Sequence, residues 1–81
     1  MSNKVEIKII TTDDEWVFYK IMAIFSKKRF VVRSLVMSSK PDKDIQEYSI
    51  VIESAFWIKM NILPQLNNQI GILGATMERL T

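Results

Sequence analysis

Apolar and polar residues alternate near the start of the chain, where charged side chains separate Val5, Ile7 and Ile9. A period of two is typical of a β-strand with one buried face. The sequence therefore predicts a first strand over residues 5–9.

The pattern then changes to helical spacing, with apolar side chains recurring every three or four positions over residues 17–28. Such spacing predicts an amphipathic helix. The acidic residues before it suit a helix N-terminus, and Thr12 or Asp13 is the predicted capping residue.

Two further strands are predicted on either side of a polar turn at residues 38–44. Residues 30–37 are rich in β-branched side chains, and residues 45–52 alternate so that Tyr48 and Ile50 share one face. A short polar turn between two strands favours an antiparallel hairpin.

Helical spacing returns over residues 56–69, followed by a short apolar segment at residues 72–78. Pro64 lies inside the predicted helix, where it either kinks the helix or marks a late start. Gly71 suits the left-handed position that ends a helix, and Gly74 weakens the last strand.

The predicted order is β-α-β-β-α-β, which gives an α+β, ferredoxin-like domain over residues 1–81 with a four-stranded antiparallel sheet. Both helices are expected on one face. Val31, Leu35 and Val51 are expected on the other face, where several apolar residues together favour an interface.

Composition removes several classes of function. The 81 residues include no Cys and no His, so thiolate chemistry and the usual general base are excluded. The net charge of +2 is scattered, and a nucleic-acid partner is not expected. Neither a membrane-spanning segment nor a signal peptide is evident, so the cytoplasm is the expected location.

The acidic run of Asp13, Asp14 and Glu15 has two interpretations. It forms either a metal or acid–base site or, as we favour, a capping run, because consecutive carboxylates do not converge on one centre. Trp16 and Trp57 are interpreted as aromatic lids over the edge of the core. Trp16 alternatively forms the wall of a ligand site. No metal or cofactor is expected.

Two segments resemble the ACT domains in small regulatory subunits of acetohydroxyacid (acetolactate) synthase. Residues 24–35 (IFSKKRFVVRSL) are similar to the family's leucine-phenylalanine pair, two basic residues and following phenylalanine. Residues 65–70 (QLNNQI) are similar to its glutamine-leucine-asparagine run before the last strand. The two segments lie at the family's spacing.

The resemblance implies a non-catalytic subunit that docks on and activates the catalytic subunit in branched-chain amino-acid biosynthesis. It also implies a homodimer formed through sheet or helix edges, with an amino-acid effector, often valine, between two domains. The catalytic subunit, and not this chain, would carry the cofactors.

The chain departs from the family in the effector loop. Asp13, Glu15 and Trp16 stand where the family has asparagine, proline and glycine, and Val31 replaces another asparagine. This chain looks closer to the valine-insensitive branch, which departs at the same glycine, so weakened or lost valine feedback is expected. The tentative ligand-binding residues are Asp13, Asp14, Glu15, Trp16, Val17 and Val31.

Two alternatives to a synthase subunit remain open. The first is a free-standing dimeric sensor of an amino acid or another small molecule, with residues 13–17 as a reshaped pocket. The second is a general protein-interaction module on the same fold.

Overall fold

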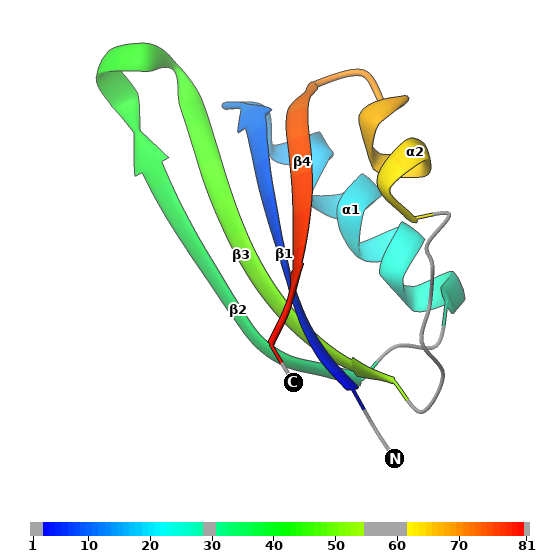
Figure 1. Cartoon of the computed structure of the whole chain (residues 1–81). Coiled ribbons are helices and arrows are strands. Elements are labelled where there is room, and N and C mark those ends of the chain that lie inside the picture. The colour runs from blue at the N-terminus through cyan, green and yellow to red at the C-terminus, as the bar shows by residue number, and fades with distance from the viewer. Residues whose placement is uncertain (1–2, 29–30, 55–61, 81) are drawn as a thin grey trace.

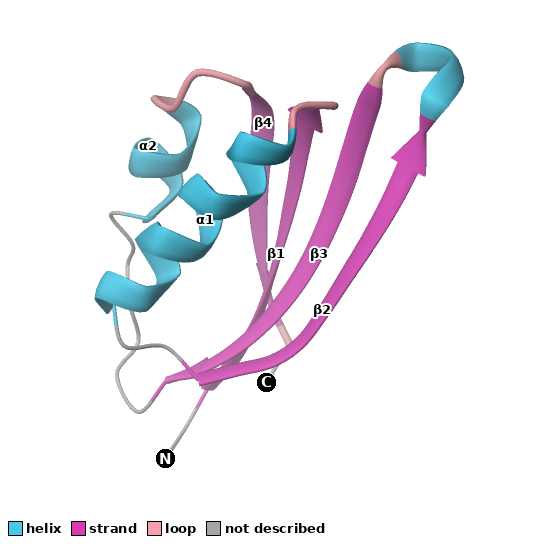
Figure 2. Ribbon diagram, turned by 180° about the vertical axis from the view of Figure 1, so that it is seen from behind, coloured by secondary structure: helices cyan, strands magenta, loops and turns pink. Residues whose placement is uncertain are grey.

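The computed structural model describes residues 3–28, 31–54 and 62–80. Its elements are β1 (Asn3–Thr12), α1 (Glu15–Lys28), β2 (Val31–Lys40), the 3₁₀ turn η1 (Pro41–Lys43), β3 (Ile45–Ser54), α2 (Ile62–Asn67) and β4 (Ile72–Arg79). The strands form one antiparallel sheet in the order β2-β3-β1-β4. Both helices cover the same face (Figures 1 and 2). The predicted ferredoxin-like fold is therefore confirmed.

Among the described residues, a cluster of apolar side chains lies between the sheet and the helices. In α1 the buried residues recur at an interval of four, which places them on one face of the helix. In β1 and β3 they alternate, as the sequence predicts. The cluster consists of Val5, Ile7, Ile9, Val17, Ile21, Phe25, Tyr48, Ile50, Ile52, Ile62 and Leu66. Each such burial contributes about 1.5–3 kcal/mol relative to exposure, which makes this cluster the main source of stability.

The β2–β3 hairpin is longer than the sequence predicts. Ser38, Ser39 and Lys40 continue the ladder with β3 instead of forming a turn. The chain reverses through η1, and Asp44 follows with a φ of 54°. Aspartate tolerates this left-handed conformation better than most residues, which explains how so short a connection closes the hairpin.

A bulge in β2 corrects the predicted orientation of Leu35. Val32 pairs with Ile52 but Ser34 pairs with Val51, so Arg33 is an extra residue and the alternation shifts by one. Leu35 therefore lies opposite Ile50 on the face that carries the helices. The expectation that Leu35 lies on the other face was wrong. That face, called the open face below, does carry Val31 and Val51.

Both helices differ from their predicted bounds. α1 begins at Glu15, two residues early, so Asp14 takes the capping position. The described part of α2 is Ile62–Asn67, and Pro64 lies in its first turn, where N–H groups lack partners within the helix. Residues 56–61 of the predicted helix, including Trp57, lie outside the described residues.

Gly71 adopts the left-handed conformation that the sequence predicts, with a φ of 96°. It lies at the entrance of β4, four residues after the end of α2, and not directly at the helix end. Its carbonyl accepts a hydrogen bond from the Thr12 backbone N–H at 2.8 Å. Gly71 therefore connects the start of β4 to the end of β1.

Candidate functional site

The loop between β1 and α1 contains the predicted acidic run. The Thr12 hydroxyl donates to Asp14 Oδ2 at 3.0 Å, and the Asp14 carbonyl accepts from the Val17 backbone N–H at 3.1 Å. Asp13 accepts from the side chain of Gln46, which is on β3. The three neighbouring carboxyl groups of Asp13, Asp14 and Glu15 are all exposed. Within the described residues, no group of three or more acidic side chains is arranged to hold a metal ion.

Trp16 packs against the turn at Gly71. A Cβ added to Gly71 would lie 3.5 Å from Trp16 Cη2 and only 2.7 Å from Val17 Cγ2. The Lys20 ammonium lies 4.5 Å from the centroid of the Trp16 ring system, in a cation–π contact. This position agrees with the predicted aromatic lid over the edge of the core.

A chain of hydrogen bonds runs from the core to the acidic loop. The Tyr48 hydroxyl donates to Gln46 Oε1 at 2.9 Å, and Gln46 Nε2 donates to Asp13 Oδ1 at 2.7 Å. Burial raises the pKa of Tyr48, a hydrogen bond with Thr11 lowers it, and the Asp13 carboxylate raises it further. Tyr48 is therefore a neutral donor that fixes the Gln46 amide.

The first candidate site is a groove between α1 and the β2–β3 hairpin, which we call the α1–β2 groove. It encloses about 290 Å³ and is lined by Glu15, Phe18, Tyr19, Met37, Gln46 and Tyr48. Glu15, Phe18 and Tyr19 share one helix face because they are spaced at i, i+3 and i+4. Two carboxylates, Asp13 and Glu15, therefore lie at or beside an aromatic groove.

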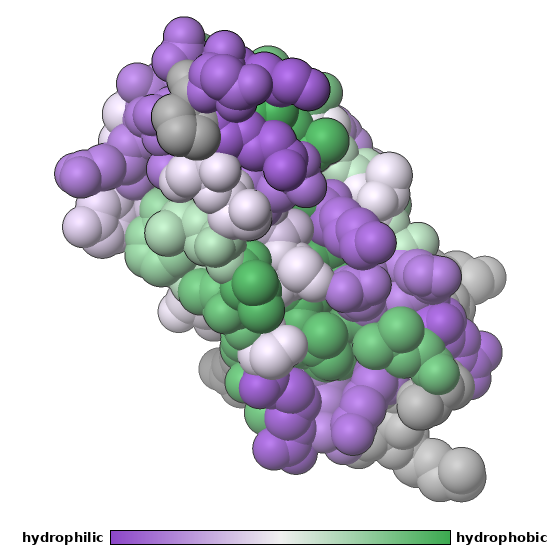
Figure 3. Space-filling model, turned by 90° about the vertical axis from the view of Figure 1, so that its left-hand side faces the viewer, coloured by the Kyte–Doolittle hydropathy of each residue, from purple (hydrophilic) through white to green (hydrophobic). Residues whose placement is uncertain are grey.

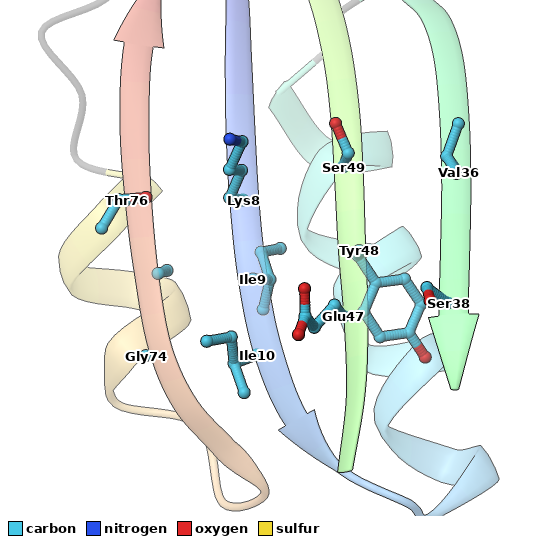
Figure 4. Close-up of a pocket in the computed structure, with 11 residues that line it drawn as sticks. Lys8, Ile9, Ile10, Val36, Ser38, Glu47, Tyr48, Ser49, Gly74 and Thr76 are labelled. Carbon is cyan, nitrogen blue, oxygen red and sulfur yellow. The ribbon is translucent and has the colours of Figure 1, made fainter. Parts of the chain in front are cut away.

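The second hollow lies on the open face and encloses about 360 Å³. Lys8 and Ile10 of β1 and Glu47 and Ser49 of β3 line it (Figure 4). Each charged residue that lines it has an ionic partner outside the lining: Lys8 Nζ lies 4.0 Å from Glu6 Oε1, and Glu47 Oε2 lies 3.7 Å from Lys40 Nζ. Because Lys8 and Glu47 are both paired already, this hollow offers little unbalanced charge to a ligand.

The predicted ligand-binding residues do not all converge. Glu15 lines the α1–β2 groove and Asp13 is one hydrogen bond away from it, whereas Val17 is fully buried in the core. Val31 lies at the other end of the sheet. Val31 and Lys4 both pair with Glu53, so Val31 lies beside the Lys4 end of β1. The acidic loop follows Thr12 at the opposite end of β1, eight residues away, which is roughly 26 Å at about 3.3 Å per residue.

The aromatic part of the groove was not predicted from the sequence. Phe18 and Tyr19 belong to the helix predicted over residues 17–28, and Tyr48 belongs to one face of the strand predicted over residues 45–52, but no groove between these elements was predicted. The spacing of an acidic residue and two aromatic residues on one helix face was the available signal. Met37 is 53% exposed, so it does not fill the core.

The β2 edge carries five large exposed apolar side chains within seven residues. Val31, Val32, Leu35, Val36 and Met37 are between 39% and 60% exposed. Figure 3 faces this edge and shows hydrophobic residues gathered below the polar tip of the hairpin. The helices lie over β1 and β4 and leave β2 uncovered (Figures 1 and 2).

None of the described helices is both long enough and apolar enough to cross a membrane.

No protein-family model matches the chain, and no curated protein matches it. Solved structures do. An uncharacterized protein from Thermotoga maritima superposes with a TM-score of 0.75 at 10% identity, covering 100% of both chains. The ACT domain from GTP pyrophosphokinase of Chlorobium tepidum gives 0.72 at 20% identity, covering 99% of this chain and 100% of that one.

The C-terminal domain of the MgtC protein from Mycobacterium tuberculosis gives a TM-score of 0.78 at 12% identity, covering 96% of this chain and 87% of that one. At these identities the similarity establishes the fold alone. The chain has the ferredoxin-like fold of an ACT domain, with the βαββαβ order and the antiparallel sheet predicted from its sequence.

Proposed function

We propose that this chain is a non-catalytic regulatory subunit of ACT type. In this proposal it docks on the catalytic subunit of acetohydroxyacid synthase, activates it in branched-chain amino-acid biosynthesis, and has weakened or lost valine feedback. The exposed apolar β2 edge is the observation that carries the docking role. A strand that is apolar on both faces has the composition of one buried on both sides.

The locations of the two family-like segments support the synthase assignment. Residues 24–28 end α1 and residues 31–35 open β2, while residues 65–70 span the end of α2 and the turn after it. These are the elements in which the resemblance expects them. The match is therefore one of position within the fold as well as of residue type.

The proposed homodimer uses the same edge. Edge strands present free backbone N–H and C=O groups, and natural proteins normally shield long apolar edges with charges, bulges or cover. Pairing of β2 with β2 of a second copy would satisfy these groups and remove the exposed valines from water. The dimer and the synthase contact would then occupy neighbouring parts of one surface.

The loop supports the loss of valine feedback. An amino acid presents a carboxylate, and Asp13 and Glu15 would repel it where the family has uncharged residues. Trp16 occupies the space beside Gly71 that the family keeps free with a glycine. Both changes disfavour a zwitterionic ligand in this loop.

The test is co-purification with the synthase catalytic subunit encoded in the same genome, followed by activity assays with and without valine. We expect a stable complex, higher activity than the catalytic subunit alone, and no inhibition by valine. A chain that neither binds nor activates that subunit contradicts the proposal. Inhibition by valine contradicts only the loss of feedback.

A second function, a free-standing small-molecule sensor, is favoured by one observation, the α1–β2 groove. A calorimetric screen of the twenty standard amino acids tests it for amino-acid ligands. Binding without any association with the synthase would favour the sensor over the subunit.

A further inference from the structure

The α1–β2 groove combines an aromatic wall with an acidic rim. Phe18 and Tyr19 lie edge to face with centroids 5.7 Å apart, and Phe18 and Tyr48 stack at 6.1 Å. Tyr19 is 68% exposed, so its ring is available to a ligand. The face of an aromatic ring carries partial negative charge and attracts cations, and the Met37 thioether opposite is polarizable.

The charges at the rim are unbalanced. Within the part of the chain that the structure describes, Glu15 takes part in no ion pair. Asp13 accepts its hydrogen bond from the neutral Gln46 amide. The nearest lysine along α1, Lys20, is placed over the Trp16 ring. Two carboxylates therefore act on the groove, and no described lysine or arginine lines it.

This charge pattern selects among ligand classes. The two carboxylates repel an anion. They also repel the carboxylate of a free amino acid, and this repulsion cancels much of the attraction between them and its ammonium group. A bare divalent cation needs several oxygen ligands around one centre, and the described acidic side chains form no such group. An amine without a carboxylate gains from both the rim and the wall.

We propose that the α1–β2 groove binds a small organic cation that lacks a carboxylate, such as a primary amine with an apolar body. Its ammonium lies between the Glu15 carboxylate and the Tyr19 ring, and its apolar part lies against Phe18 and Met37. The volume of about 290 Å³ is at the small end for ligand pockets, which fits a compact amine. This inference deepens the proposed regulatory role by naming a ligand class, and rests on that role only for its biological use.

The experiment compares three probes that share a phenyl ring and differ in charge: 2-phenylethylamine, L-phenylalanine and 3-phenylpropionate. Each is titrated into the intact chain and followed by isothermal calorimetry and by NMR shifts of the aromatic side chains. We expect the amine to bind about tenfold more tightly than phenylalanine, because Glu15 and Asp13 repel the carboxylate that only phenylalanine carries beside its ammonium. The anion should not bind, and the amine's affinity should fall as salt is added.

Two variants locate the site. Glu15→Gln keeps the shape and removes the charge, so it should weaken amine binding several-fold, and Tyr19→Leu should do the same by removing the ring. Glu78→Gln, an exposed acidic position on β4, is the matched control and should change nothing. Absence of amine binding, equal affinity for the three probes, or unchanged amine binding in Glu15→Gln would each overturn the proposal.

The proposed function fails or succeeds separately. A chain that activates the synthase and binds none of the probes retains its regulatory role and loses the cation site. A chain that binds the amine at Glu15 and ignores the synthase retains the site and loses the subunit role.

Discussion

The two edge strands of the sheet, β2 and β4, differ in what covers them. Ile72, Ala75 and Met77 of β4 pack against the core, and α2 lies alongside this strand (Figure 1). β2 has a similar apolar content, but its described side chains are exposed from Val31 to Ser39. Both strands contain a bulge, so irregularity does not distinguish them. The two strands differ in whether a helix covers them. The uncovered strand, β2, is apolar on both faces, which is the composition of a strand that is buried against a partner.

The largest expected effect comes from the glycine that connects β4 to the body of the domain. Gly71→Ala places a Cβ 2.7 Å from Val17 Cγ2 at a φ of 96°. Left-handed strain and overpacking together should destabilise the fold by about 2–4 kcal/mol. The melting temperature should fall by roughly 10–25 °C for a domain of this size, measured by circular dichroism.

Gly74→Ala is the matched control on the same strand, because nothing lies within 4 Å of an added Cβ there. It should leave stability unchanged or raise it by about 0.5–1 kcal/mol, since alanine loses less entropy than glycine in a strand. Equal losses at both glycines would show that β4 is not held through the Gly71 contact.

The next effect concerns association through β2. Val36→Lys, at a side chain that is 60% exposed, should weaken a dimer paired along this edge about 100-fold. The estimate assumes about 1.5 kcal/mol of lost burial in each of the two copies. Sedimentation equilibrium measures the dissociation constant. Leu73→Lys, 59% exposed on β4, is the control and should have no effect.

Equal weakening of the dimer by both lysine variants would contradict the predicted difference between the β2 and β4 edges. A wild-type chain that stays monomeric at millimolar concentration would contradict the proposed homodimer. The β2 edge would then be available to bind the synthase or another partner.

The sequence predicted the fold because periodicity reports which face of an element is buried. Alternation in β1 and β3 and the spacing in α1 reappear directly in the core. The face of Leu35 could not be predicted, because the bulge at Arg33 depends on pairing with β3 and leaves no sign in the strand's own alternation. The hairpin's length was missed for a similar reason, since polar residues such as Ser38 pair by their backbone as readily as apolar ones.

The candidate site was predicted only in its acidic half. Asp13 and Glu15 stood out as charges in a loop, whereas the groove exists because β2 extends beyond the helices (Figure 2), so that Met37 of β2 and Tyr19 of α1 both line it. Such a gap depends on how elements are placed in three dimensions. The helix predicted over residues 17–28 left out Glu15, and nothing in the sequence showed what lies opposite Phe18 and Tyr19.

A pair of methionine variants compares the edges through stability. Met77→Ala on β4 removes a half-buried side chain that packs against the core, and should cost about 1–2 kcal/mol. Met37→Ala on β2, 53% exposed, should cost less than about 0.5 kcal/mol in the monomer. Urea unfolding at low protein concentration measures both, and a larger loss at Met37 would mean that β2 is covered within the monomer.

The smallest effect appears only in alkali and tests how the β2–β3 hairpin is anchored. Tyr48 lies opposite Met37, and burial raises its pKa above the ordinary value of 10.0. The folded state therefore keeps the phenolic proton after the unfolded chain has lost it. This contribution is complete below about pH 10 and disappears as the pH rises through the folded-state pKa, with a slope of at most about 1.4 kcal/mol per pH unit. The experiment measures urea midpoints between about pH 9 and 11. Tyr48→Phe should lack the loss of stability that ionisation of this phenol causes, whereas Tyr19→Phe should still show it. The same decline in Tyr48→Phe and the wild type would show that the hairpin is not anchored by a buried neutral phenol.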